Sequence, residues 1–309
     1  MLQSVEGREL ITLRRLGPLV HGTYHRGNDK NSAIGDEKRV GILFLNSLSL
    51  PRAATGDSYV YWADCFADSG YPSFRIDLPG LGDSDGNLPQ DLLVFINSGG
   101  FASVAAQKAR ELVETFNLSG VIIVGHCAGA VSALFAAGRC AECKGLVLLD
   151  VSFHLSQAVR PKIRQKLSSW ALNSRLGRFA SEVYDRLRQI RLSLMGNRLP
   201  DNANVPLLRC WKNLASTGLP ILILKAPARK ALGVKPRVGK FDYMAHALRI
   251  AGGRSQVKVE LTEGTDHSFA NRLGRSAVQE RVEDWLRYYF PIAQKQPSDR
   301  LAALKHSVV

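Results

Sequence analysis

The sequence predicts an α/β protein whose mostly parallel central sheet is covered by helices on both faces. Apolar runs of strand length recur along the chain, at 39–46, 73–78, 120–125, 145–150, 220–226 and 257–263. Patterns of helical length lie between several of them, at 59–69, 103–116, 128–139 and 276–289. Continuous apolar strands that alternate with helices are typical of a parallel sheet buried on both sides.

Two stretches depart from this alternation. The segment "HGTYHRG" at 21–27 precedes the first strong strand and predicts an antiparallel lead-in hairpin. From 151 to 217 there is no convincing strand, and the helical pattern predicts an insertion between two strands of the sheet. We therefore expect a core formed by 1–150 and 218–292, a helical insertion at 151–217, and a polar tail at 293–309.

Length and composition support a globular protein with reduced thiols. The 309 residues are 45% hydrophobic, which is enough for a real core. The amino terminus has scattered charges, and no apolar run approaches the roughly 18 residues of a membrane span, so we expect no transmembrane segment and a cytoplasmic location. Five cysteines do not resemble a disulfide framework. The pair Cys140 and Cys143 has no second pair or nearby histidine to complete a metal site, so no metal or cofactor is expected.

The charge of the chain is strongly positive and concentrated in one segment. The formal net charge is +14, and between 156 and 198 there are ten Lys and Arg against Glu182 and Asp185. Such a balance favours an anionic partner. Nucleic acid is not expected as that partner, because the few aromatic residues of the basic segment are not regularly interleaved with its charges.

The motif that carries chemistry is Gly125-His126-Cys127-Ala128-Gly129, which lies between a strand pattern and a helix pattern. It fits the nucleophile elbow, in which a strained turn lifts the nucleophile above the sheet and small residues two positions away avoid collision. The amino terminus of the helix favours a thiolate and a developing oxyanion. Cys127 is therefore the predicted nucleophile.

The elbow requires a base and an oxyanion hole. His267, in "EGTDHSFAN", follows the last predicted strand and precedes the terminal helix, so we expect it to reach the carboxyl edge of the sheet. The oxyanion hole should pair the backbone N–H of Ala128 with one from the loop after the first core strand, at Ser47 or Leu48.

Together these residues resemble the α/β-hydrolase superfamily over about 20–290. The loop "RIDLPGLGDSDG" at 75–86 is similar to the family's Asp-x-x-Gly-x-Gly-x-Ser loop, the insertion stands in the position of its cap domain, and "DHSF" matches its histidine segment. The resemblance implies an eight-stranded sheet and hydrolytic or acyl-transfer chemistry. More narrowly, the three motif segments resemble the cysteine-containing hydrolases associated with exosortase and exopolysaccharide systems.

The acid of the triad is left open between two candidates. The family usually places it after the strand that follows the insertion, but "LKAPARKALGVKP" offers no acid there, and Asp242 is the first one downstream. Asp150, at the tip of "GLVLLD", borders the same crevice, and some family members place the acid at the matching position. We favour Asp150, keep Asp242 as the alternative acid, and leave open a Cys-His dyad or another acid.

A cysteine nucleophile changes the expected reaction. Its acyl-enzyme is a thioester, which exchanges with other thioesters and is attacked well by amines, so acyl transfer or thioesterase activity is predicted. We assign substrate binding to His126 and to two arginines of the insertion, Arg160 and Arg164. The positive charges of these arginines suit coenzyme A thioesters or an acidic acyl carrier protein. The alternatives are a simple carboxylesterase or lactonase, and a catalytically silent binding protein. A cysteine that replaces a natural serine is a further alternative.

Overall fold

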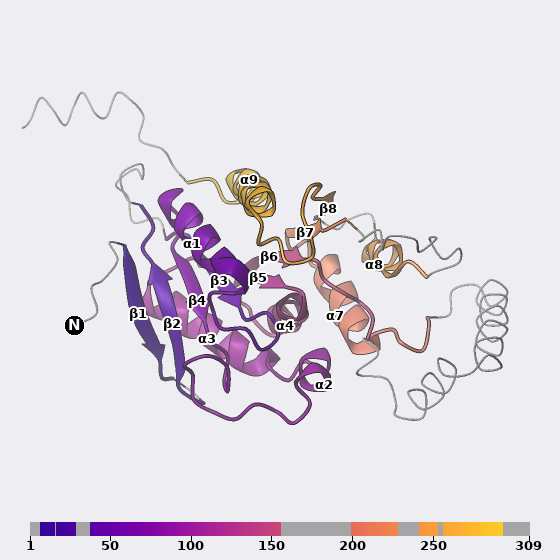
Figure 1. Cartoon of the computed structure of the whole chain (residues 1–309), viewed down its shortest axis with the longest axis horizontal. Coiled ribbons are helices and arrows are strands. Elements are labelled where there is room, and N and C mark those ends of the chain that lie inside the picture. Colours follow the sequence, from indigo (N-terminus) through magenta and orange to yellow (C-terminus); the bar gives the residue numbers. More distant parts are fainter. Residues whose placement is uncertain are drawn as a thin grey trace, which may run out of the picture.

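A computed structural model describes residues 7–15, 17–28, 38–155, 199–227, 241–252 and 256–292. Its centre is an eight-stranded sheet in the order β1-β2-β4-β3-β5-β6-β7-β8 (Figure 1). The strands are β1 Arg8–Leu13, β2 Val20–His25, β3 Val40–Leu45, β4 Ser73–Ile76, β5 Gly120–His126, β6 Cys143–Leu149, β7 Ile221–Lys225 and β8 Val257–Leu261. β2 runs antiparallel to β1 and β4, and the remaining neighbours are parallel. The predicted fold class is therefore confirmed.

Helices cover both faces of the sheet and enclose two apolar cores (Figure 1). α1 (Ser58–Asp68) and α9 (Arg272–Tyr289) pack on one face. The other face is covered by a larger group, namely α2 (Leu92–Asn97), α3 (Ala102–Thr115), α4 (Ala128–Ala137), α7 (Val205–Ser216) and α8 (Tyr243–Ala251). Every residue of β5 is buried, as expected for a strand between two helical layers.

The lead-in hairpin is longer than the sequence indicated. Its second strand, β2, matches the expectation, but its partner β1 was not predicted, because half of the residues of this edge strand are exposed and it contains no apolar run. Helices α2, α7 and α8 were not predicted either.

The predicted insertion at 151–217 is described only at its ends, because 156–198 lie outside the described residues, as does the tail at 293–309. At its carboxyl end, α7 packs against α4 and α8. The fully buried ring of Trp211 donates a hydrogen bond of 2.8 Å to the carbonyl oxygen of Ala247 and lies edge-on to Phe153. This helix therefore forms part of the layer that covers the sheet.

Strand register brings the predicted site residues to one edge of the sheet. Leu45, the last residue of β3, pairs with Gly125, and His126 pairs with Leu149, the last residue of β6. The segments that follow β3, β5 and β6 therefore leave the sheet side by side. They carry the loop 46–52, Cys127 and Asp150.

Candidate active site

Cys127 lies on a strained turn between β5 and α4. Its backbone has φ 54° and ψ −114°, a conformation that non-glycine residues rarely adopt. Its N–H donates to the carbonyl oxygen of Leu149 at 2.8 Å, which fixes the turn to the neighbouring strand. The side chain is partly exposed at the amino terminus of α4. The local geometry is that of a nucleophile elbow.

The two glycines of the motif are required by close backbone approach. A Cβ at Gly125 would lie 2.2 Å from the carbonyl oxygen of Gly129. A Cβ at Gly129 would lie 2.5 Å from the carbonyl oxygen of Asn46. Any side chain at either position would thus push the elbow away from its own helix or from the loop after β3.

His267 and Asp150 are brought together at the elbow. Nδ1 of His267 is hydrogen-bonded to Oδ2 of Asp150, and the ring also interacts with the side chain of Cys127. The hydrogen bond with Asp150, followed by that with Cys127, raises the pKa of His267 to about 10 against the opposing effect of burial. The structure thus places the thiol of Cys127, the imidazole of His267 and the carboxylate of Asp150 next to one another.

Lys225, at the end of β7, is the site residue that the sequence analysis missed. Its ammonium forms an ion pair with Oδ1 of Asp150 and donates to the carbonyl oxygen of Val151 at 3.3 Å. Burial acts to raise the pKa of Asp150, but the hydrogen bonds from His267 and Lys225 lower it below its ordinary value. The signal was present in the sequence, since a lysine ends the strand after which the family usually carries the acid.

Asp242, the alternative acid, is placed elsewhere. It is the N-cap of α8, and its carboxylate accepts a hydrogen bond of 2.9 Å from the N–H of Ala245. Asp266 is next to His267 in the sequence. Its carboxylate accepts a hydrogen bond of 2.9 Å from the N–H of Ser268 and so orders the loop that carries His267. Neither is the carboxylate bonded to Nδ1 of His267.

The expected oxyanion loop passes close to the elbow. Leu48 has φ 54°, and Ala128 is buried at the start of α4. Among the described residues, no carbonyl oxygen of a loop, turn or helix cap accepts a hydrogen bond from the backbone N–H of Leu48 or of Ala128. The Ser47 hydroxyl, which is buried, lies 3.2 Å from Nδ1 of His126.

His126 has a different position from the one expected of a substrate-binding residue. Its Nε2 lies 2.6 Å from the carbonyl oxygen of His267, so Nε2 carries the proton and Nδ1 accepts from the hydroxyl of Ser47. Burial lowers its pKa to about 4, which keeps the ring neutral. Both ring nitrogens are thus bonded to protein groups, and the expected contact of His126 with substrate stays a prediction. His126 links the end of β5 to the loop after β3, through Ser47, and to the loop that carries His267.

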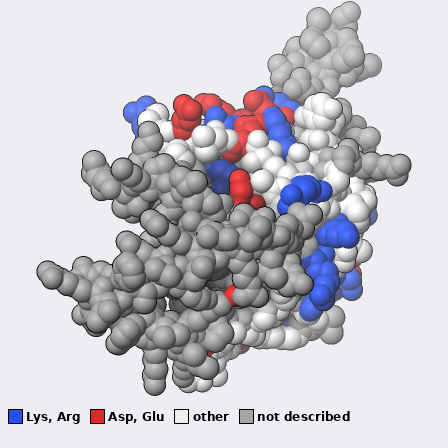
Figure 2. Space-filling model, turned by 90° about the vertical axis from the view of Figure 1, so that its right-hand side faces the viewer, with Lys and Arg blue, Asp and Glu red and all other residues white. Residues whose placement is uncertain are grey.

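Arg160 and Arg164 lie outside the described residues, so their assignment to substrate binding stays a prediction. Figure 2 shows that the described Lys and Arg side chains gather along one side of the face that it displays, while acidic side chains gather at its upper edge. On this face the described charges are therefore unevenly distributed.

The described residues offer neither a metal site nor a membrane-spanning helix. No group of three or more His, Cys, Asp or Glu side chains in that part of the chain is arranged to hold a metal ion. None of the helices described is long and apolar enough to cross a membrane.

Comparisons with known proteins point to one fold. The family model described as the alpha/beta hydrolase fold matches residues 44–186. No curated protein matches the chain by sequence.

Solved structures match nearly the whole chain at low sequence identity. DcsB in complex with its substrate analogue has a TM-score of 0.59 at 14% identity and covers 92% of this chain and 99% of its own. The Pyrococcus furiosus esterase Pf2001 has a TM-score of 0.55 at 11% identity, with 92% and 91% coverage. The N-acyl homoserine lactonase AidH has a TM-score of 0.51 at 14% identity, with 94% and 100% coverage.

Proposed function

Because this chain is a protein of the α/β-hydrolase fold, we propose that it is an acyl hydrolase or acyltransferase that works through a thioester on Cys127. The observation that carries the proposal is the line of Cys127, His267 and Asp150 at the carboxyl edge of the sheet. An imidazolium beside a cysteine favours its thiolate form, which is the reactive nucleophile. The raised pKa of His267 supports such an ion pair at neutral pH.

The first half-reaction transfers the acyl group to sulfur. The thiolate of Cys127 attacks the carbonyl carbon of an ester or thioester, and the oxyanion accepts hydrogen bonds from the N–H of Ala128 and of Ser47 or Leu48. As the tetrahedral intermediate collapses, the bond to the leaving alcohol or thiol breaks. The protonated His267 gives its proton to that leaving group, and a thioester remains on Cys127.

The second half-reaction transfers the acyl group to an acceptor. Water, an alcohol or an amine attacks the thioester carbonyl and loses a proton to His267, while the bond to the Cys127 sulfur breaks and regenerates the thiolate. An amine is a better acceptor for a thioester than for an oxygen ester, so the cysteine favours transfer over hydrolysis. Asp150 keeps Nδ1 of His267 bonded, which leaves Nε2 to face the sulfur in both half-reactions.

The proposed donors are coenzyme A thioesters or acyl chains on an acidic carrier protein. The ten Lys and Arg between 156 and 198 support this choice, since guanidinium groups bind phosphates and acidic surfaces through charge-assisted hydrogen bonds. Arg160 and Arg164 are the residues we assign to this contact.

A simple esterase or lactonase is the second candidate. It is favoured by the structural similarity to the Pyrococcus furiosus esterase and to the lactonase AidH, both of which share the fold of this chain. In this case water is the only acceptor, and the same three residues act in the same order.

Intact-mass spectrometry of the full chain distinguishes these functions. The protein is exposed to acyl-coenzyme A, an acyl carrier thioester and simple esters, and then to amines. We expect a mass gain mapped to Cys127 with thioesters, discharged faster by amine than by water. Discharge by water alone selects the esterase or lactonase. No adduct and no turnover with any donor contradicts the enzyme proposal and favours a binding protein.

A further inference from the structure

We infer that Asp77 is a positioning residue that holds the oxyanion loop, here residues 46–52, against the elbow. The inference rests on the proposed function, because it assigns a role in stabilising the oxyanion of that reaction. Asp77 follows β4, and its side chain is completely buried. Its carboxylate is hydrogen-bonded to Asn46, Arg52 and Asp83 and not to Cys127 or His267. It therefore acts on the site through the oxyanion loop.

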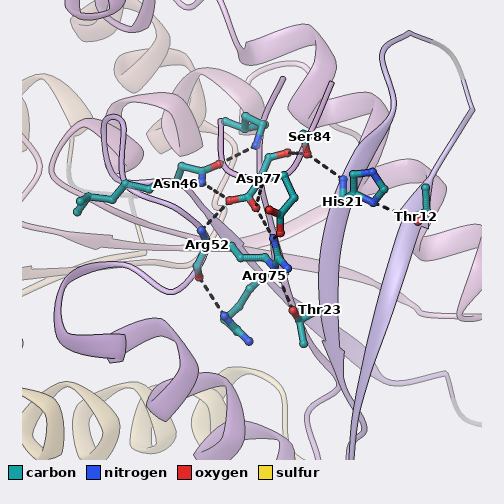
Figure 3. Close-up of polar contacts among 11 residues, drawn as sticks. Thr12, His21, Thr23, Asn46, Arg52, Arg75, Asp77 and Ser84 are labelled. Atoms are coloured by element: carbon teal, nitrogen blue, oxygen red, sulfur yellow. Dashed lines mark hydrogen bonds and ion pairs between the residues drawn. The ribbon is translucent and has the colours of Figure 1, made fainter. Parts of the chain in front are cut away.

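One carboxylate ties both ends of the oxyanion loop. Oδ1 of Asp77 accepts from Nδ2 of Asn46 at 2.8 Å and from the backbone N–H of Arg52 at 2.6 Å (Figure 3). Oδ2 accepts from the guanidinium of Arg52 and, at 3.3 Å, from the N–H of Asp83. The two residues that begin and end the loop are therefore held by the same buried anion.

Asn46 transmits this restraint to the elbow. Its side chain also donates to the carbonyl oxygen of Leu50 at 3.0 Å and accepts from the N–H of Leu78 at 2.7 Å. Its own carbonyl oxygen is the atom that leaves no room for a Cβ at Gly129 on α4. A movement of Asn46 would therefore change the distance between the loop and the helix that carries Ala128.

The residues between the two anchors depend on them. Leu48 holds a φ of 54°, which is unfavourable for a residue with a Cβ and persists only where the surroundings impose it. Ser47 is restrained by His126 and accepts a hydrogen bond of 3.1 Å from the N–H of Leu50. The loop N–H groups proposed as oxyanion donors, those of Ser47 and Leu48, thus lie on a strained segment that is fixed at each end by Asp77.

The anchor is itself attached to the sheet. Arg52 donates from Nε to the hydroxyl of Thr23 on β2 at 3.1 Å. Ser84 bridges the carbonyl oxygen of Asp77, at 2.6 Å, and the N–H of His21 on β2, at 2.8 Å (Figure 3). Gly82 packs so closely on the carboxylate that a Cβ there would lie 2.2 Å from Oδ2. Asp77 therefore connects the loop to a rigid part of the fold.

The test compares two reactions of the same sulfur. Acylation of Cys127 by p-nitrophenyl acetate passes through an oxyanion, whereas alkylation by iodoacetamide does not. In Asp77→Asn an amide N–H replaces an acceptor that faces the Arg52 guanidinium and the Asp83 N–H. We expect the acylation rate to fall about 10- to 100-fold, as for a displaced oxyanion donor, while the alkylation rate stays within about twofold.

Glu111→Gln is the matched control. Glu111 is also a buried carboxylate that accepts from two backbone N–H groups, those of Arg14 at 2.7 Å and Arg15 at 3.1 Å, and from Lys108. It supports the end of β1 instead of the oxyanion loop. We expect it to lower thermal stability as Asp77→Asn does, but to leave the ratio of acylation to alkylation unchanged. Equal ratios in the two variants would overturn the inference.

An Arg52→Lys variant and NMR spectra of the loop test the role of Asp77 independently of the Asp77→Asn kinetics. Arg52→Lys retains the positive charge but loses the guanidinium fork, so it should fold and show an intermediate loss of acylation; an unchanged acylation rate would count against the proposed role. Backbone amide signals of Ser47 and Leu48 in NMR spectra should shift in Asp77→Asn and not in Glu111→Gln. If wild type forms no acyl-enzyme, the proposed function fails, while these signals still decide whether Asp77 positions the loop.

Discussion

At the residue scale, one carboxylate holds two cationic groups in place. Asp150 presents Oδ2 to His267 and Oδ1 to Lys225, so its orientation is fixed from both sides. Lys225 ends β7, the strand after which α/β-hydrolases usually carry the acid. Asp150 instead follows the neighbouring strand β6. The sequence allowed two acids because chain order is the same for both. The hydrogen bond between His267 and Asp150 favours Asp150, because the carboxylate of Asp242 instead caps α8.

Replacement of Asp150 by Asn should separate a triad role from a general effect of charge. Loss of the carboxylate removes the main cause of the raised pKa of His267, so that pKa should fall from about 10 toward its ordinary value. The alkaline limb of the pH profile for Cys127 alkylation should move to lower pH by at least about one unit, and kcat/KM should fall about 100-fold or more.

Asp242→Asn is the control for this prediction. Asn is as good an N-cap as Asp, so the stability of α8 should change little and kcat/KM should stay within about twofold of wild type. A larger loss in Asp242→Asn than in Asp150→Asn would reverse the assignment of the acid.

At the element scale, the strand, turn and helix around Cys127 were predictable because local sequence determines them. The apolar run of β5, the glycine spacing and the small residues of α4 all indicate the same structure. Elements that the sequence did not indicate carry weaker local signals. Half of the residues of β1 are exposed, α2 has six residues, and α7 follows the basic segment in the sequence. Their positions follow from tertiary packing instead.

Gly125→Ala tests whether the elbow depends on close backbone approach. The added methyl group would lie 2.2 Å from the Gly129 carbonyl oxygen, so the turn must shift. We expect a loss of several kcal/mol in the free energy of unfolding, about 3 or more, together with slower alkylation of Cys127.

Gly218→Ala serves as the comparison for that experiment. A Cβ at Gly218 meets no atom within 4 Å, and only its positive φ of 76° opposes the substitution. Its cost should be about 1–2 kcal/mol, with normal alkylation of Cys127. Equal costs at the two glycines would show that steric exclusion at the elbow is unimportant.

At the scale of the whole molecule, buried polar networks join segments that are far apart in sequence. His25 is bonded to Asp64 at 2.7 Å and to Arg75 at 2.8 Å, and Arg75 reaches the carbonyl oxygen of Arg52. Composition and periodicity cannot indicate such pairings, since each partner alone reads as an ordinary surface residue. The sequence therefore predicted the fold and named three residues that the structure places together, but it indicated neither Lys225 nor the networks around the candidate site.

The two buried histidines predict a loss of stability in mild acid. Burial lowers the pKa of His25 and of His126 to about 4, and the charge of Arg75 adds to the effect at His25. In the unfolded chain both titrate near 6.5, so the unfolded state binds more protons between these values. The stability that they contribute is present above about pH 6.5 and is lost as pH falls toward about 4.

Urea denaturation across this pH window measures the effect. The free energy of unfolding should decrease by up to about 2.7 kcal/mol per pH unit, the value for two protons. His126→Gln should reduce that slope by up to about half. A slope that is unchanged in the variant, or a wild-type stability that is flat from pH 6.5 to 4, would contradict the neutral, buried state of these rings.

Turnover of the best acyl donor by Cys127→Ala tests most directly whether Cys127 is the nucleophile. The small side chain fits the turn, so the variant should retain the wild-type circular dichroism spectrum and unfolding midpoint. We predict that its turnover falls by at least about 1,000-fold and that no acyl adduct forms on the protein. Retained turnover in a folded Cys127→Ala, or an adduct that maps to another residue, would contradict the assignment of Cys127 as the nucleophile.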